Sequence, residues 1–239
     1  MCSSDLCPLL VFETGFNAHP DLLGVTWITL AVLAAGRRRG PAAGATAALA
    51  AATKATALLL APLVLRRAGR AGWAAGAALL AALYGPFLLQ GGQAEFAGLR
   101  AMGAEWEFNS GVFGLVQALA GTPAARAVGA AGTLAAWAWM CHRAFHGTAA
   151  ALTVPWVVAG WLVFSPVVNP WYALWLLPWV ALRWTPLGLA ALGAVTLAHV
   201  THGNLGLAGG VHEHPAWVRP LEYGGIAAAA LWTGVRRRG

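Results

Sequence analysis

Charged residues are scarce in this chain of 239 residues. They make up 10% of it, whereas hydrophobic residues make up 59% and the mean hydropathy is +0.65. A water-soluble domain carries about 25% charged residues. Apolar runs recur along the whole sequence, separated by arginine clusters and by Gly/Pro turns. The sequence therefore indicates a multi-pass protein of the cell membrane.

Cysteines and the common catalytic signatures are also few or missing. Cys2, Cys7 and Cys141 have no metal-ligand spacing and imply no disulfide framework. The sequence contains no G-x-x-x-x-G-K-[ST] phosphate loop, no H-E-x-x-H helix and no G-x-S-x-G elbow. We therefore predict no metal site and commit to no cofactor.

The net charge of +7 does not indicate a nucleic-acid partner. A nucleic-acid surface needs basic residues interleaved with polar ones on a soluble face, and no such stretch is present. Each basic cluster instead flanks an apolar run, as in the short cytoplasmic loops of membrane proteins. These clusters are at 36–40, 66–70, 141–146, Arg183 and 236–238.

We predict an all-α fold: one transmembrane bundle over 1–239 with about seven crossings. Residues 41–65 have arginine clusters at both ends, so we expect a re-entrant pair of short helices broken near "TKAT" (53–56). Residues 91–121 are expected outside the membrane, with an interfacial helix over 95–119. The crossings are expected at 21–36, 72–90, 123–141, 148–165, 172–183, 186–202 and 221–235.

This topology places all eight acidic residues on the outer side of the membrane. Acidic residues contribute little to orientation, so their segregation is separate information. The outer stretch "ETGFNAHPD" (13–21) holds the first candidates. Helix-start chemistry explains Pro20 and Asp21, but it leaves Glu13, Asn17 and His19 unexplained. Because ionisable groups at membrane level are costly, we interpret this stretch as functional.

Lys54 is the only lysine and lies in the middle of the 41–65 stretch. A snorkelling side chain is the alternative, but the central position makes snorkelling difficult. A cation on a broken helix suits an anionic phosphate group. We therefore interpret Lys54 as a phosphate ligand.

The outer segment around Glu105, Trp106 and Asn109 combines carboxylate, indole and amide groups. It is typical either of an amphipathic face anchored by Trp106 or of a sugar site, where aromatic faces stack and polar groups bind hydroxyls. Four further histidines match no metal-ligand template, so we expect them to be solvated loop residues. They are His199, His202, His212 and His214.

Four stretches together resemble GT-C glycosyltransferases, particularly the bacterial mannosyltransferase-like members. "NPWYALWLLP" (169–178) resembles their Pro-Trp-Tyr element, and "EWEFNSGVF" (105–113) resembles their outer W-E-x-N segment. "NAHPD" (17–21) followed by "TKATALLLAP" (53–62) is similar to their H-x-D … K-x-x-x-x-L-x-P progression. The resemblance covers most of residues 8–185, in the same order.

The resemblance implies transfer of a sugar, with mannose as one candidate, from a polyprenyl-phosphate carrier to a glycan or glycolipid acceptor at the outer membrane face. In such enzymes an acidic residue deprotonates the acceptor hydroxyl. That residue usually follows a first spanning helix, and no such helix precedes residue 13. We therefore expect that the N-terminal helices of the fold are missing and that Glu13 or Asp21 is catalytic or supporting.

The expected substrate-binding residues combine both lines of reasoning. An aromatic belt with a proline kink accounts for the aromatics of 169–178 but not for Asn169. A small-molecule transporter and a non-catalytic membrane subunit remain as alternatives, although no internal repeat favours a transporter. The substrate-binding set is His19, Lys54, Glu105, Trp106, Asn109, Asn169, Trp171 and Tyr172.

Overall fold

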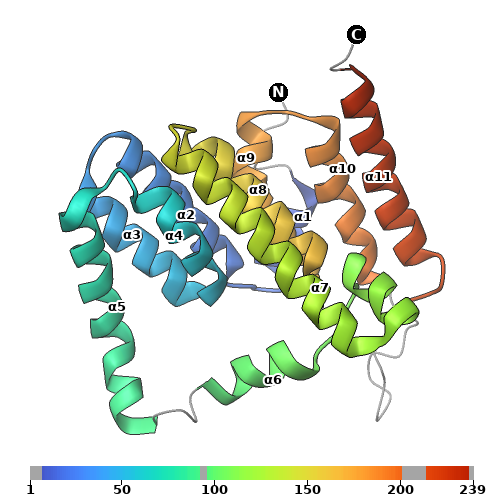
Figure 1. The fold of residues 1–239 in the computed structure, drawn as a ribbon, viewed down its shortest axis with the longest axis horizontal. Helices are drawn as coiled ribbons and strands as arrows, with labels where there is room; N and C mark the ends of the chain where they lie inside the picture. The colour runs from blue at the N-terminus through green and yellow to red at the C-terminus, as the bar shows by residue number, and fades with distance from the viewer. Residues whose placement is uncertain (1–6, 92–95, 201–213, 237–239) are drawn as a thin grey trace. The chain divides into compact units, whose positions relative to one another are not determined.

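The computed structural model describes residues 7–91, 96–200 and 214–236, which are all-helical (Figure 1). In these ranges the only extended pairing is an isolated bridge between Phe108 and Val167. The all-α prediction is therefore confirmed. The elements are α1 (Pro8–Val11), η2 (Phe12–Phe16), α2 (Asp21–Gly36), α3 (Gly40–Thr53), η3 (Ala55–Leu60), α4 (Ala61–Leu65), α5 (Gly69–Gly91), α6 (Ala97–Glu105), α7 (Val112–Phe145), α8 (Ala150–Phe164), η5 (Pro170–Leu176), α9 (Leu177–Leu182), α10 (Pro186–Ala194), η6 (Val195–His199) and α11 (Val218–Arg236).

The chain divides into two compact units. Helix α7 contributes residues to both, and the prediction of one domain over 1–239 stays a prediction. Unit 1 comprises Met1–His19, Glu107–Thr133 and Val158–Gly239, and unit 2 comprises Pro20–Trp106 and Leu134–Val157.

The helices follow the apolar runs between the arginine clusters. Helices α2, α5, α8 and α11 lie within a few residues of the runs predicted at 21–36, 72–90, 148–165 and 221–235. Helix α2 begins after Pro20 with Asp21 in its first turn, where a carboxylate interacts favourably with the helix dipole. The sequence pattern thus locates these helices correctly.

In unit 2, helix α3 packs tightly against α5 through glycine. A Cβ atom on Gly44 would lie 1.8 Å from the carbonyl oxygen of Gly72, and one on Gly40 would lie 2.2 Å from that of Ala68. The Cβ of an added residue has no room there, so the backbones of α3 and α5 approach one another closely. Most alanines of α3 are buried along the same helix, among them Ala43 and Ala50.

The break predicted near "TKAT" is confirmed. Helix α3 ends at Thr53, Lys54 takes an extended conformation (φ −153°, ψ 119°), and the 3₁₀-helix η3 begins at Ala55. Entry into and return from a bilayer at this point stay a prediction.

The single interfacial helix predicted over 95–119 is not formed. Helix α6 ends at Glu105 and α7 begins at Val112. Between them the backbone of Phe108 pairs with another segment: its N–H donates to Pro166 O (3.0 Å), and its carbonyl accepts from Val168 N–H (2.8 Å). A backbone group committed to a distant strand-like pairing cannot also form a helical turn, which is why the helix is interrupted here.

Helix α7 is itself bent at Gly121. This glycine has φ 80° and ψ 168° and is followed closely by Pro123. Glycine reaches such angles without a steric cost, and proline favours the first turn of the helix that follows. The straight part after the bend matches the run predicted at 123–141.

Seven crossings are not confirmed. Among the described residues, α5 is the one helix long and apolar enough to cross a bilayer. The segments Leu9–Phe16 and Asp21–Gly36 pass the same test together, but they meet at 119°. The other apolar helices, such as α8 and α10, are shorter than the roughly 20 residues that span a bilayer.

The close packing of α3 on α5 can be tested with one methyl group. We expect Gly44→Ala to lower the melting temperature of the purified protein, at a cost of about 1–3 kcal/mol, because the helices must separate. Gly225→Ala, in α11 with nothing within 4 Å of the new Cβ, is the matched control and should be neutral or stabilising by about 0.5–1 kcal/mol. Thermal unfolding followed by circular dichroism measures both, and equal melting temperatures would contradict the packing.

Candidate functional site

Residues 12–19 form an unusual turn that carries Glu13. Residues Phe12–Phe16 are a short π-helix, closed by the N–H of Asn17, which donates to Phe12 O (3.0 Å). The N–H of His19 then donates to Glu13 O (2.9 Å), and Ala18 has a left-handed φ of 52°. π-helical turns are rare and occur frequently at functional sites. Glu13 therefore lies within this turn, and its own carbonyl oxygen is one of the acceptors that close it.

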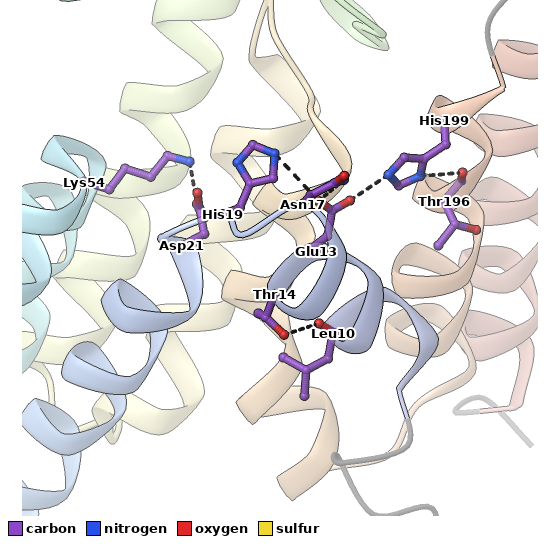
Figure 2. Close-up of polar contacts among 9 residues, drawn as sticks. All are labelled: Leu10, Glu13, Thr14, Asn17, His19, Asp21, Lys54, Thr196 and His199. Atoms are coloured by element: carbon purple, nitrogen blue, oxygen red, sulfur yellow. Dashed lines mark hydrogen bonds and ion pairs between the residues drawn. The ribbon is translucent and has the colours of Figure 1, made fainter.

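The carboxylate of Glu13 is fully buried and surrounded by donors (Figure 2). The amide of Asn17 donates to Oε2 (2.9 Å), and Nε2 of His199 lies 2.7 Å from Oε1. Nε2 of His19 is 3.8 Å from Oε2, which is an ion-pair distance but too long for a hydrogen bond. A buried charge needs such partners, and these three supply them.

His199 makes a contact through each of its ring nitrogens. Its Nδ1 lies 3.0 Å from the carbonyl oxygen of Thr196, which can only accept a hydrogen bond. Its Nε2 lies 2.7 Å from Oε1 of Glu13. These two contacts fix the orientation of the ring, and both side chains belong to unit 1.

His19 lies against an aromatic ring. Its imidazole stacks on Trp171, with ring centroids 3.7 Å apart and an interplanar angle of 19°. Trp171 in turn meets Tyr172 edge to face at 6.0 Å, and Tyr172 contacts Trp161 at 5.1 Å. The side chain of His19 is 28% exposed. His199 is similarly exposed, at 29%, so the feature that distinguishes His19 is its stacked aromatic support.

The sequence "NPWY" positions these aromatics at the start of η5. Asn169 is the N-cap of this 3₁₀-helix, but its side chain makes no capping hydrogen bond. Its carbonyl accepts from the N–H of Tyr172 (3.0 Å). Pro170 occupies the first turn, where its missing N–H costs nothing. Trp171 and Tyr172 thus belong to the same site as Glu13 and His19.

Asp21 and Lys54 form a separate pair in unit 2. The ammonium of Lys54 donates to Oδ1 of Asp21 at 2.5 Å, and the two side chains are 16% and 7% exposed (Figure 2). Because Lys54 sits at the extended break after α3 and Asp21 in the first turn of α2, the pair joins the two helices.

The predicted binding residues of the segment around Glu105, Trp106 and Asn109 are divided between the two units. Glu105 and Trp106 are exposed and belong to unit 2. Asn109 belongs to unit 1, is fully buried, and donates to both oxygens of Glu222 (3.1 and 3.0 Å). Tyr223 donates its hydroxyl to Asn109 O. Asn109 therefore anchors the backbone of the segment, and its role in substrate binding stays a prediction.

His199 corrects one expectation. The sequence indicates a solvated loop residue, but His199 ends η6 and binds Glu13. The position of His199 inside the apolar run predicted at 186–202 could have identified it as a site candidate. An ionisable residue within an apolar membrane helix is costly and is therefore a candidate for a functional role. The same signal marks Glu222, inside the run at 221–235. His214 contacts Val200 O through Nδ1, and His202, His212 and Glu213 lie outside the described residues.

Neither a metal-ligand group nor a comparison with known proteins gives further information on this site. Within the part of the chain that the structure describes, no group of three or more His, Cys, Asp or Glu side chains is arranged to hold a metal ion. Comparison of the chain with models of protein families, with curated proteins and with solved structures finds no match.

The buried pair can be tested by a double-mutant cycle. Lys54→Met leaves Asp21 buried without its cation, so we expect a loss of about 3–5 kcal/mol in the free energy of unfolding. Adding Asp21→Asn should restore much of that loss, because the uncompensated charge is then gone.

The matched control for this cycle is an exposed pair. Arg219 and Glu107 lie 3.5 Å apart with side chains 42% and 29% exposed, so Arg219→Met should change stability by about 1 kcal/mol or less. Denaturant unfolding of the purified protein measures all of these variants. Additive losses at Lys54 and Asp21 would contradict an energetic coupling.

Proposed function

We propose that this chain is an integral membrane glycosyltransferase of GT-C type. It transfers a sugar, with mannose as the first candidate, from a polyprenyl-phosphate carrier to a hydroxyl of a glycan or glycolipid at the outer face of the cell membrane. The observation that carries the proposal is the buried carboxylate of Glu13 with His19 and His199 beside it. The ordered resemblance of the four sequence stretches supports the choice of reaction.

A multi-pass membrane position is part of the proposal. Large apolar side chains are exposed on α2, α5, α7, α8 and α11, and Leu89 is 90% exposed. Soluble proteins rarely expose so much apolar surface, whereas lipid-facing helices do. The exposed apolar surface and the apolar length of α5 support this position.

In the proposed reaction His19 takes the proton of the acceptor hydroxyl. Glu13 is fully buried, with one oxygen at His199 and the other at Asn17, so it does not reach an acceptor directly. His19 is partly exposed, and a small ring movement closes its 3.8 Å gap to Glu13. Catalytic hydrogen bonds are often long before substrate binds. Glu13 then stabilises the imidazolium that forms.

The bond changes follow from that proton transfer. The acceptor oxygen forms a bond to the anomeric carbon of the sugar. The bond from that carbon to the carrier phosphate breaks, and its electron pair leaves on the phosphate oxygen. The acceptor proton moves to the ring of His19. Trp171, stacked on that ring, holds it in place.

The roles of Asp21 and Lys54 differ from those of a catalytic acid. In the proposal Asp21 positions Lys54 and is not the base, because it is held by the ammonium at 2.5 Å. Contact of Lys54 with the phosphate of the carrier stays a prediction from the sequence. A buried acid–base pair at a helix break also occurs in transporters, so uptake of a small solute is the second candidate function.

The proposed chemistry is tested by sugar transfer in membranes that carry the full chain. With a synthetic polyprenyl-phosphate mannose as donor, we expect Glu13→Gln and His19→Ala to lower the rate by about 10²–10⁴-fold, which is the usual contribution of general base catalysis. Glu222→Gln is the matched control: it also removes a carboxylate that is buried in unit 1, but one that contacts Asn109 and, among the described residues, no histidine.

The outcome distinguishes the proposed reaction from its alternatives. Unchanged transfer by Glu13→Gln would exclude Glu13 from the chemistry. Absence of transfer by the unaltered chain, together with uptake of a labelled solute that depends on Lys54, would replace the enzyme with the transporter. Equal losses in Glu13→Gln and Glu222→Gln would assign Glu13 a role in stability alone.

A further inference from the structure

Three helix connections of unit 2 meet at one end of that unit. Arg66 donates to the carbonyl of Thr148, which joins the α4–α5 connection to the α7–α8 connection. The start of α3 at Gly40 packs against the carbonyl of Ala68, which adds the α2–α3 connection. The three connections lie close together in Figure 1. This arginine end contains Arg37, Arg38, Arg39, Arg66, Arg67, Arg70 and Arg143.

The positive charge of the arginine end is not neutralised by the protein. Among the described residues, none of these arginines forms an ion pair with a carboxylate. Asp21 lies at the opposite end of α2, about 24 Å away by the helical rise, and it holds Lys54. Burial and then the neighbouring Arg67 lower the pKa of Arg66. No carboxylate among the described residues therefore competes with an outside anion for these arginines.

Helix capping does not explain the cluster. Arginine at the C-terminal ends of α2 and α7 interacts favourably with the helix dipole. Arg70, however, lies in the first turn of α5, where a positive charge is unfavourable. Helices α2 and α7 end at these arginines, whereas α5 begins there. The helix dipoles therefore do not explain why the arginines are concentrated at this end.

Each of the three helices also exposes a large apolar side chain one turn from its arginine. Trp73 is 46% exposed and lies three residues after Arg70, and Trp139 is 58% exposed and lies four residues before Arg143. Leu33, 49% exposed, stands in the same relation to Arg37 on α2. Residues three and four apart share one face of a helix. Tryptophan and arginine side by side are typical of the headgroup level of a membrane.

We propose that the arginine end binds the phosphate groups of anionic phospholipids in the inner leaflet. The shared chemistry is a phosphate anion, and the exposed Trp73, Trp139 and Leu33 select a lipid over a free phosphate because they reach the acyl boundary. The proposal rests on the membrane position in the proposed function but not on glycosyl transfer.

The test is a thermal-shift titration of the purified full chain in detergent. The probes are dioctanoyl phosphatidylglycerol, dioctanoyl phosphatidylcholine, glycerol 3-phosphate and inorganic phosphate. We expect phosphatidylglycerol alone to raise the melting temperature in a saturable way. Equal effects of the two phospholipids, or of inorganic phosphate and phosphatidylglycerol, would overturn the proposal.

The variants replace one exposed arginine from each connection. Arg39→Gln, Arg70→Gln and Arg143→Gln together should weaken the apparent affinity for phosphatidylglycerol by tenfold or more, since each arginine near an anionic bilayer contributes roughly fivefold. Arg66 and Arg67 stay in place because they hold the α7–α8 connection.

The control variant loses the same charge elsewhere. It combines Arg100→Gln, Arg126→Gln and Arg183→Gln, all exposed and all outside the arginine end, and it should retain the affinity. Equal weakening in both triple variants would show that only net charge matters and would overturn the site. Sugar transfer by membranes is measured in parallel, so a failed lipid site is distinguished from a failed enzyme.

Discussion

A carboxylate that is removed from water must be matched by donors or by a proton, and Glu13 sets this requirement for the N-terminal part of unit 1. The π-helical turn brings Asn17 onto one of its oxygens, and η6 brings His199 onto the other. His19 is then held between the same carboxylate and the face of Trp171. The site is therefore one network, in which each partner orients the next.

In unit 2 the main constraint is the packing of helices that have few large side chains at their contact. Glycine and alanine let α3 approach α5 closely, so contact between backbones replaces contact between bulky side chains. The same packing brings the helix connections and their arginines together. Close packing of small residues and a concentrated positive end are thus two results of one arrangement. The pair of Lys54 and Asp21 ties α2 to the break after α3 within the same unit.

Much of the local structure is predictable from the sequence, because it depends on short-range chemistry. Pro20 and Asp21 mark the start of α2, and the polar "TKAT" marks the end of α3. The grouping of Glu13, Asn17 and His19 is predictable for the same reason, since they lie within seven residues. The interruption after Glu105 is not predictable, because Phe108 pairs with residues nearly sixty positions further on.

The sequence by itself determined the all-helical class, the positions of helices such as α2, α5, α8 and α11, and the presence of costly polar groups in an apolar chain, since propensity, capping and hydropathy act over a few residues. Only the tertiary structure decided which polar groups are partners. It joined Glu13 to His199, 186 residues away, paired Lys54 with Asp21, and placed Asn109 on Glu222. The physical reason is that burial makes each of these groups require a partner, whereas the identity of that partner depends on the packing of distant helices.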